Sequence, residues 1–339
     1  MKDITHKNHY VPQFYLKNWS QDRKKIWVYS LLVPHAKVPY WQKKSIEYVA
    51  VWNDFYTQYN GEKEVDDFEK WFNKEFETPA EPVIQKLIDN KPIARQEEIL
   101  LTHYVMAQDL RVPARVNDIL DCTRNTINDY FDSFPSISIK EEIKKASYYS
   151  ESNVKLPIKV HLNKEKRQVE FKAFVGRSFY LNTLKYTLTT TVKQAEKRKW
   201  HVIHVADGIS FPTSDNPVIR LNLYKSYNNY RKNKYDFKSG WGNKHGDIIM
   251  PLSPKHVLIS ENGIKGNTPN LNNSVYWSEF FRKIIIEHAY RYVFAYEKQK
   301  GMLSINPRRV NKERFLAEKN TMNIWHEYNM KEEQEIMGT

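Results

Sequence analysis

Apolar and polar residues change their spacing several times along the chain, and each change predicts a different element. Residues 25–31, KIWVYSL, alternate between the two classes and are β-branched or aromatic, which is typical of a strand. A second extended segment, SIEYVAVWNDFYTQ, follows after a loop that contains prolines. The first sixty residues are therefore expected to form short strands joined by loops.

Helical spacing dominates from residue 62 to about residue 120. In residues 64–77, apolar side chains recur at helical intervals with charges between them, which predicts an amphipathic helix. Pro79 and Pro82 are expected to break or restart that helix. A second helix is predicted over residues 94–116, ending or kinking near its proline, and a third over residues 115–134.

The second half of the chain mixes strands with long helices. Residues 156–163 and 167–174 are predicted to form a hairpin, and residues 177–200 a helix. Several strand-like pieces follow between residues 200 and 261, and a final helix is predicted over residues 272–296.

Together these elements predict an α+β fold. Its first half is rich in helices, and a mixed or antiparallel sheet comes mainly from the second half and from the N-terminal strands. Residues 1–300 are expected to form a single large domain, with a possible subdivision in the polar stretch near residues 148–156. Residues 301–339 are expected to form a charged C-terminal helix or tail.

Composition narrows the class of protein. The hydrophobic fraction of 40% and the aromatic fraction of 14% exclude a disordered chain, which needs low hydrophobicity to stay unfolded. The single cysteine, Cys122, can form no internal disulfide and leaves no CxxC zinc motif, so a reducing cytoplasm is expected. No secretory signal is recognisable, and charges interrupt every apolar window short of a membrane span. We therefore expect a soluble cytoplasmic protein with no membrane partner.

The charge of the chain favours an anionic partner. It carries 53 Lys and Arg against 40 Asp and Glu, a net charge of +13. Such a balance favours nucleic acid, through release of counterions, or a phosphorylated ligand. A lysine-rich surface that only confers solubility is the alternative.

Common catalytic signatures are missing from the sequence. It contains no GxxxxGK[ST], GxGxxG, HExxH or GxSxG motif. Their absence argues against P-loop NTPases, Rossmann dehydrogenases, zincin proteases and ordinary α/β-hydrolases.

The stretch HYVMAQDLRVPAR carries the first candidate chemistry. Tyr104, Gln108 and Arg111 are spaced i, i+4 and i+7, so one helical face presents all three. The Arg111 guanidinium offers a planar fork for a phosphate or carboxylate. The alternative is that Arg111 pairs with a nearby acid and that Gln108 caps a loop.

The stretch SFPTSDNPVIRL carries the second group of candidate functional residues. Ser214, Asp215 and Asn216 precede a proline, which is turn chemistry because Asp and Asn side chains bond their own backbone. Strand-like residues flank this turn, so Asp215 would lie at a strand end, where functional carboxylates are common. A purely structural turn is the alternative.

Four motifs occur in a fixed order along the chain: HYVPQFYL, QDLRVP, SDNPV and PLSP. With these motifs the chain resembles a bacterial and phage-associated family of unknown function, over roughly residues 9–295. The resemblance implies that His9, Gln108, Arg111 and Asp215 converge in one pocket. It names no ligand for that pocket.

These residues favour a nuclease-like hydrolase acting on nucleic acid, with bacterial defence against phage as the implied setting. His9 is the candidate general acid or base, since the pKa of histidine lies near neutrality. Arg111 would stabilise charge that develops on the phosphate, and Asp215 would orient His9 or hold a divalent metal such as Mg²⁺. The candidate substrate-binding residues are Gln13, Tyr104, Gln108, Ser214 and Asn216.

Two alternatives stay open. A nucleic-acid-binding or nucleotide-binding module without catalysis would use aromatic residues as stacking platforms between Lys and Arg. A nucleotide-dependent transferase would instead grip a phosphorylated substrate with Arg111. The sequence leaves open the oligomeric state and the choice between DNA and RNA.

Overall fold

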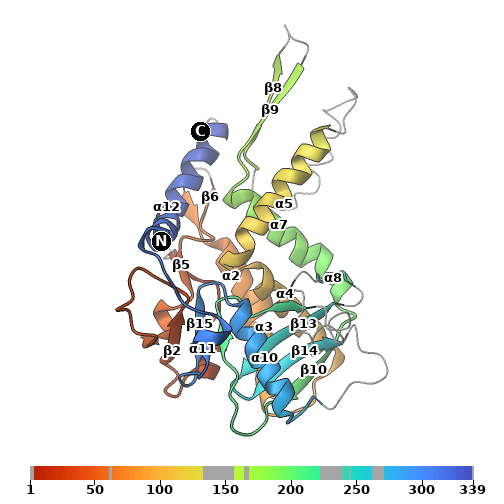
Figure 1. Cartoon of the computed structure of the whole chain (residues 1–339). Helices are drawn as coiled ribbons and strands as arrows, with labels where there is room; N and C mark the ends of the chain where they lie inside the picture. Colours follow the sequence, from red (N-terminus) through yellow and green to blue (C-terminus); the bar gives the residue numbers. More distant parts are fainter. Residues whose placement is uncertain are drawn as a thin grey trace.

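The structure of the chain is a computed structural model that describes residues 4–60, 63–132, 156–163, 168–221, 237, 240–243, 246–261 and 271–337. Over these residues, helices surround two four-stranded antiparallel sheets (Figure 1). The sheet strands come from the second half of the chain and from its first sixty residues. The predicted α+β class is confirmed. No helix in the described ranges is long and apolar enough to cross a membrane.

The first sheet has the strand order β10, β14, β13, β12. Its strands are β10 (Lys199–His204), β12 (Ile219–Leu221), β13 (Asp247–Ser253) and β14 (His256–Glu261). All seven residues of β13 are buried, because helix α10 (Val275–His288) covers one face of the sheet and the main core covers the other. Ile249 packs in the cluster with α10, whereas Ile248 and Met250 pack in the main core.

The second sheet has the strand order β11, β15, β2, β4. Its strands are β2 (Lys25–Ser30), β4 (Trp41–Ser45), β11 (Thr213–Ser214) and β15 (Tyr292–Ala295). The prediction of one helix over residues 272–296 is wrong in its last part, because α10 ends at His288 and β15 follows. The aromatic and β-branched residues of β15 pair with β2 on one side and with β11 on the other.

The helical residues 67–88 form one uninterrupted path along the chain. It consists of α2 (Asp67–Phe72), the π-helical stretch η3 (Asn73–Glu77) and α3 (Thr78–Ile88). Pro79 lies in the first turn of α3 and Pro82 lies inside that helix, so the prolines mark a restart and not an end. A π stretch shifts the backbone hydrogen-bond ladder, and both prolines lie directly after that shift.

Pro113 separates the next two helices. Helix α4 (Arg95–Leu110) ends before it, and α5 (Pro113–Asp132) begins with it. In the first turn of a helix the missing N–H of proline would have had no partner in any case. The helical layer is completed by α7 (Arg177–Tyr186), the π stretch η4 (Thr187–Thr191) and α8 (Val192–Ala195).

The N-terminal stretch connects the two sheets. Its elements are β1 (Lys7–His9), which pairs with β5 (Val51–Asn53), then α1 (Gln13–Leu16) and η1 (Lys17–Trp19). The hydroxyl of Tyr15 lies 2.7 Å from the backbone oxygen of Pro251 and 2.7 Å from the hydroxyl of Thr213. Trp19 Nε1 donates to the backbone oxygen of Phe211 at 2.8 Å. These buried bonds fix the stretch against β13 and against the chain that leads into β11.

Shorter elements complete the fold. They are β3 (Leu32–Val33), η2 (Ile46–Tyr48), β6 (Gln58–Asn60), β7 (Lys63–Val65), β8 (Ile158–Asn163), β9 (Gln168–Ala173), α11 (Met302–Ile305) and β16 (Arg309–Val310). The predicted hairpin is confirmed as β8 and β9, which extend away from the sheets in Figure 1. The subdivision predicted near residues 148–156 falls outside the described residues, apart from Leu156.

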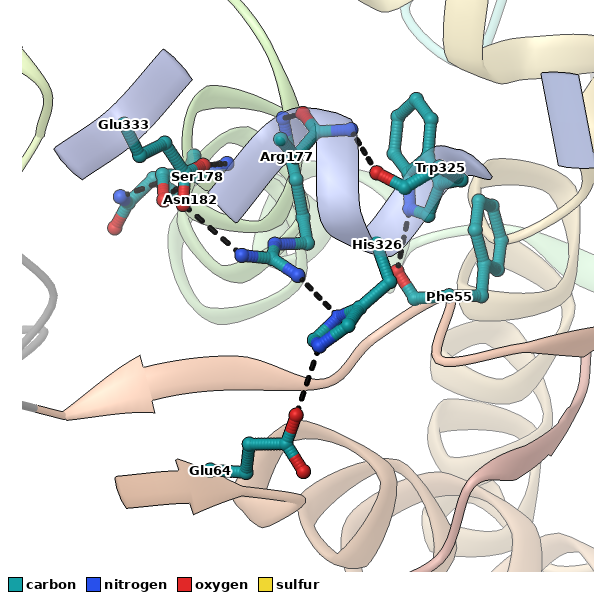
Figure 2. Close-up of polar contacts among 9 residues, drawn as sticks. Phe55, Glu64, Arg177, Ser178, Asn182, Trp325, His326 and Glu333 are labelled. Atoms are coloured by element: carbon teal, nitrogen blue, oxygen red, sulfur yellow. Dashed lines mark hydrogen bonds and ion pairs between the residues drawn. The ribbon is translucent and has the colours of Figure 1, made fainter. Parts of the chain in front are cut away.

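The C-terminal segment packs on the rest of the chain through its long charged helix, α12 (Lys312–Met337). Figure 2 shows how buried Arg177 of α7 holds this helix: its guanidinium donates to Glu333 at 3.0 Å and lies 2.8 Å from His326 Nδ1. The other ring nitrogen of His326 lies 2.9 Å from the carboxylate of Glu64 in β7. In addition, β16 pairs in parallel with β3.

Candidate active site

The N-terminal stretch from β1 to η1 (residues 7–19), called the opening stretch below, meets the end of α4 through buried polar contacts. Arg111 is 1% exposed, and its guanidinium donates to the backbone oxygen of His9 and pairs with Glu77. Gln108 Nε2 donates to the backbone oxygen of Tyr10 at 2.9 Å. Both side chains therefore hold the main chain of the opening stretch in place. The guanidinium expected to clamp a phosphate is paired with an internal acid, which is the alternative that the sequence left open.

A cavity of about 250 Å³ lies beside this junction. The N-terminal stretch forms one wall, and the path from α2 through η3 to α3 forms the other. Its lining residues are His9, Pro12, Gln13, Phe14, Glu69, Asn73, Glu77, Thr78 and Glu81. Pockets for drug-sized ligands measure about 300–1,000 Å³, so this cavity suits a small substrate group.

Four polar residues of the helical wall are spaced four apart: Glu69, Asn73, Glu77 and Glu81. In a regular α-helix each such step turns by about 40°, which would spread the four side chains around the helix. The stretch η3 is π-helical, and its wider turn reduces that rotation. All four residues consequently line the same cavity.

Burial shifts the pKa values of two lining groups in opposite directions. Burial raises the pKa of Glu69 to about 7. The positive charge of Arg111 opposes this rise, and the negative charge of Glu77 adds to it. Burial lowers the pKa of His9 below the ordinary 6.5. The backbone of Ile46 opposes this shift, and the positive charge of Arg111 adds to it. Near pH 7, His9 is therefore mostly neutral, and about half of the Glu69 carboxyls keep a proton.

Each of these two groups has a polar atom available for a ligand. His9 Nε2 and Glu69 Oε2 are buried and have no hydrogen-bond partner among the described residues. Buried polar atoms are nearly always paired, so such atoms in a cavity indicate a missing partner. A neutral base and a protonated acid in one cavity are the groups that general acid–base catalysis needs.

Asp215 lies away from the cavity and binds backbone. Its carboxylate accepts the N–H groups of Tyr290 at 2.9 Å and Arg291 at 2.8 Å, and its own N–H donates to the oxygen of Tyr292 at 3.1 Å. Burial raises its pKa to about 6, although these backbone bonds oppose the rise. The carboxylate therefore fixes the connection from α10 to β15. No group of three or more His, Cys, Asp or Glu in the described ranges is arranged to hold a metal ion.

The other substrate-binding candidates divide between the cavity and the core. Gln13 lines the cavity together with His9. Tyr104 is 1% exposed and packs on Phe14, with 5.7 Å between the ring centroids. Ser214 accepts the N–H of Asn216 at 3.1 Å, inside the core.

Of the four residues that the resemblance places in one pocket, His9 alone lines this cavity; Gln108, Arg111 and Asp215 do not. Three glutamates take their place: Glu69, Glu77 and Glu81. Sequence reasoning misses them because a helix with many charges ordinarily turns its carboxylates to solvent. Their four-residue spacing is the signal that points to them.

Comparison with known proteins places the chain in one family. A family model described as "Protein of unknown function (DUF4238)" matches residues 7–299. The chain belongs to the DUF4238 family. No curated protein and no solved structure matches it. The DUF4238 region contains the opening stretch, α4 and the helical wall, and so it includes every residue that lines the cavity.

Proposed function

We propose that this DUF4238 protein is a hydrolase that uses His9 and Glu69 as its acid–base pair. The proposal rests on one observation: both residues line one cavity, with pKa values shifted in opposite directions and an unpaired polar atom on each. Below pH 7, Glu69 holds a proton that it can donate, while neutral His9 can accept one. Positioned acids and bases typically accelerate a reaction by about 10²–10⁴-fold.

A phosphodiester of nucleic acid is the proposed substrate, because a net charge of +13 favours polyanions. The glutamates of the cavity repel a phosphate less than their number suggests. Glu69 is largely protonated below pH 7, and the charge of Glu77 is balanced by Arg111. Glu81 is exposed, where water and salt screen its charge.

In the proposed reaction, His9 Nε2 takes a proton from the attacking water while the water oxygen bonds to phosphorus. Glu69 gives its proton to the leaving oxygen as the bond between that oxygen and phosphorus breaks. The proton on His9 then returns to Glu69 through solvent, which restores both groups. Gln13 and Thr78 supply an amide and a hydroxyl at the cavity that can orient the substrate. Defence against phage is the proposed setting of this reaction.

Cleavage of fluorescently labelled single-stranded RNA and DNA tests the proposal. We expect the wild-type protein to cleave at least one of them, and His9→Gln and Glu69→Gln to slow cleavage by about 100-fold or more. His35→Gln and Glu279→Gln change exposed residues outside the cavity and should retain the wild-type rate. Binding without cleavage would favour the non-catalytic module, and cleavage that survives both cavity substitutions would contradict the assignment of the pair.

A further inference from the structure

The opening stretch carries Lys7 and His9 on the same face of β1. Residues two apart in a strand point to the same side, and Asn8 between them is fully buried on the other side. Lys7 is exposed, whereas His9 lines the cavity. Two residues of a strand span about 7 Å, so a ligand that reaches His9 can also reach Lys7.

The short helix η2 lies beside this face of β1. The Lys7 ammonium lies 3.6 Å from the carboxylate of Glu47. The backbone of Ile46 and Glu47 lies close enough to the ring of His9 to oppose the fall in its pKa. In addition, η2 leads into β5, which pairs with β1. The helix therefore flanks both the lysine and the histidine.

Tyr48, the last residue of η2, presents its ring to solvent. Of the large apolar and aromatic residues in the described ranges it is the most exposed, at 66%. A side chain this open to water adds little to the core, so packing does not account for an aromatic residue here. The ammonium of Lys7 lies 4.5 Å from the centre of the ring. An aromatic ring next to a cation is the combination with which proteins hold single-stranded nucleic acid.

The ion pair between Lys7 and Glu47 leaves the lysine available to a ligand. Both side chains are more than half exposed, at 53% and 56%, and ion pairs in water contribute about 0–1 kcal/mol. A phosphate can therefore replace the carboxylate of Glu47. A base on Tyr48 must come from a single strand, because a base in a duplex has to leave its stack first.

We propose that Tyr48 and Lys7 form a subsite that holds one nucleotide of a single-stranded nucleic acid beside His9. The base stacks on the ring of Tyr48, and Lys7 binds an adjacent phosphate. Every base has a face that can stack, so the subsite accepts all four bases. It rests on the proposed function, because it presumes a nucleic-acid substrate, but both of its residues lie outside the lining of the cavity.

Fluorescence anisotropy with labelled single-stranded oligonucleotides tests the subsite, with RNA and DNA as separate probes. All variants also carry His9→Gln, so that cleavage does not consume the probe. We expect Tyr48→Ala to weaken binding by about tenfold or more, because the base loses its stacking partner. Tyr48→Phe keeps the ring and should bind within about twofold of the parent protein. Tyr186→Ala, which removes an exposed tyrosine of α7, should do the same.

A probe without bases, a chain of deoxyribose phosphates alone, separates stacking from charge. Tyr48→Ala and its parent should bind this probe equally. Lys7→Gln should instead make the slope of log affinity against log salt concentration less steep by about 0.7, the contribution of one phosphate on a single strand. Lys193→Gln removes an exposed lysine of α8 and should leave the slope unchanged.

Three results would overturn the subsite: parental affinity in Tyr48→Ala, an unchanged salt slope in Lys7→Gln, or no binding of either probe. Cleavage assays on variants that keep His9 distinguish this failure from that of the proposed function. Binding that depends on Tyr48 in a protein that cleaves neither probe would support the subsite and reject the hydrolase. Cleavage with an unchanged KM in Tyr48→Ala would support the hydrolase and overturn the subsite.

Discussion

At the scale of single residues, Glu69 and Glu77 differ in how their buried charge is balanced. Glu77 pairs with Arg111, whereas Glu69 Oε2 has no partner among the described residues and burial raises the pKa of its carboxyl to about 7. The two residues lie on one helical path and line one cavity. Neighbouring carboxyls with such different partners are suited to different tasks in a reaction.

The raised pKa of Glu69 makes stability depend on pH. The carboxyl titrates near 4.5 in the unfolded chain and near 7 in the folded protein. Its stabilising contribution is therefore fully present below pH 4.5 and is lost as pH rises through 7, a loss of about 3 kcal/mol at about 1.4 kcal/mol per pK unit. Because Gln cannot ionise, Glu69→Gln should be more stable than the wild type at pH 8 and about equally stable at pH 4.

Urea unfolding of both proteins at these two pH values measures the difference. The wild type and Glu81→Gln, which changes an exposed carboxyl of the same wall, should respond to pH alike. A stability difference between Glu69→Gln and the wild type that is the same at both pH values would show that Glu69 is not held protonated.

Asp215→Asn distinguishes a structural from a catalytic carboxylate. The substitution replaces one of the two oxygens that accept backbone N–H groups from Tyr290 and Arg291. One buried donor then loses its partner, which should lower the free energy of unfolding by about 1–3 kcal/mol. We expect the cleavage rate per folded molecule to stay within about threefold of wild type, because catalysis requires groups within hydrogen-bond reach of the substrate. Loss of cleavage in a well-folded Asp215→Asn variant would contradict the structural role and indicate that Asp215 takes part in catalysis.

At the scale of elements, a buried ion pair joins α12 to α7. Arg177 of α7 is fully buried, and Glu333 of α12 accepts its guanidinium together with the N–H and hydroxyl of Ser178 (Figure 2). Glu333→Gln leaves a buried guanidinium without its counter-charge, so the free energy of unfolding should fall by about 3 kcal/mol. Amide hydrogen exchange across α12 should rise in parallel.

Glu335→Gln is the matched control on the same helix. Glu335 is 60% exposed and pairs with Lys172 at 3.6 Å, so its loss should change stability by less than about 0.5 kcal/mol. Equal effects of the two substitutions would contradict the role of Arg177 in holding α12.

Local patterns in the sequence predict most elements but not all. Residues 25–31 alternate, and β2 forms there, because alternation is a local signal. The strand β15 is missed because its pairing with β2 joins opposite ends of the chain and overrides the helical spacing before it. The π-helical character of η3 is missed as well, although it brings the polar residues of the helical wall to the cavity.

The candidate site is predictable only in part for a related reason. His9 and Gln13 are found from the opening motif and do line the cavity. Arginine and aspartate side chains bind buried backbone groups as readily as they bind substrates. Only the observed contacts of Arg111 and Asp215 show that both have the structural role. The pKa shift of Glu69 arises from burial, which no spacing in the sequence reveals.

At the scale of the whole molecule, the net charge of +13 predicts how nucleic acid binds. Each phosphate neutralised on a single strand contributes about −0.7 to the slope of log affinity against log salt concentration. Fluorescence anisotropy at increasing salt should therefore give a steep negative slope. His9→Gln should leave that slope unchanged, because His9 is mostly neutral at pH 7. Affinity that does not respond to salt would argue against a polyanionic substrate.

The assignment of His9 and Glu69 is tested most sharply by the pH dependence of kcat/KM for cleavage, in the wild type and in Glu69→Gln. For the wild type we predict a bell-shaped dependence of kcat/KM on pH. The rate should fall above about pH 7, where Glu69 loses the proton that it donates, and on the acid side of pH 6.5, where His9 gains the proton that blocks it. The residual activity of Glu69→Gln should lack the alkaline limb. A wild-type rate that keeps rising through pH 7 to a plateau, or an unchanged alkaline limb in Glu69→Gln, would contradict the pair.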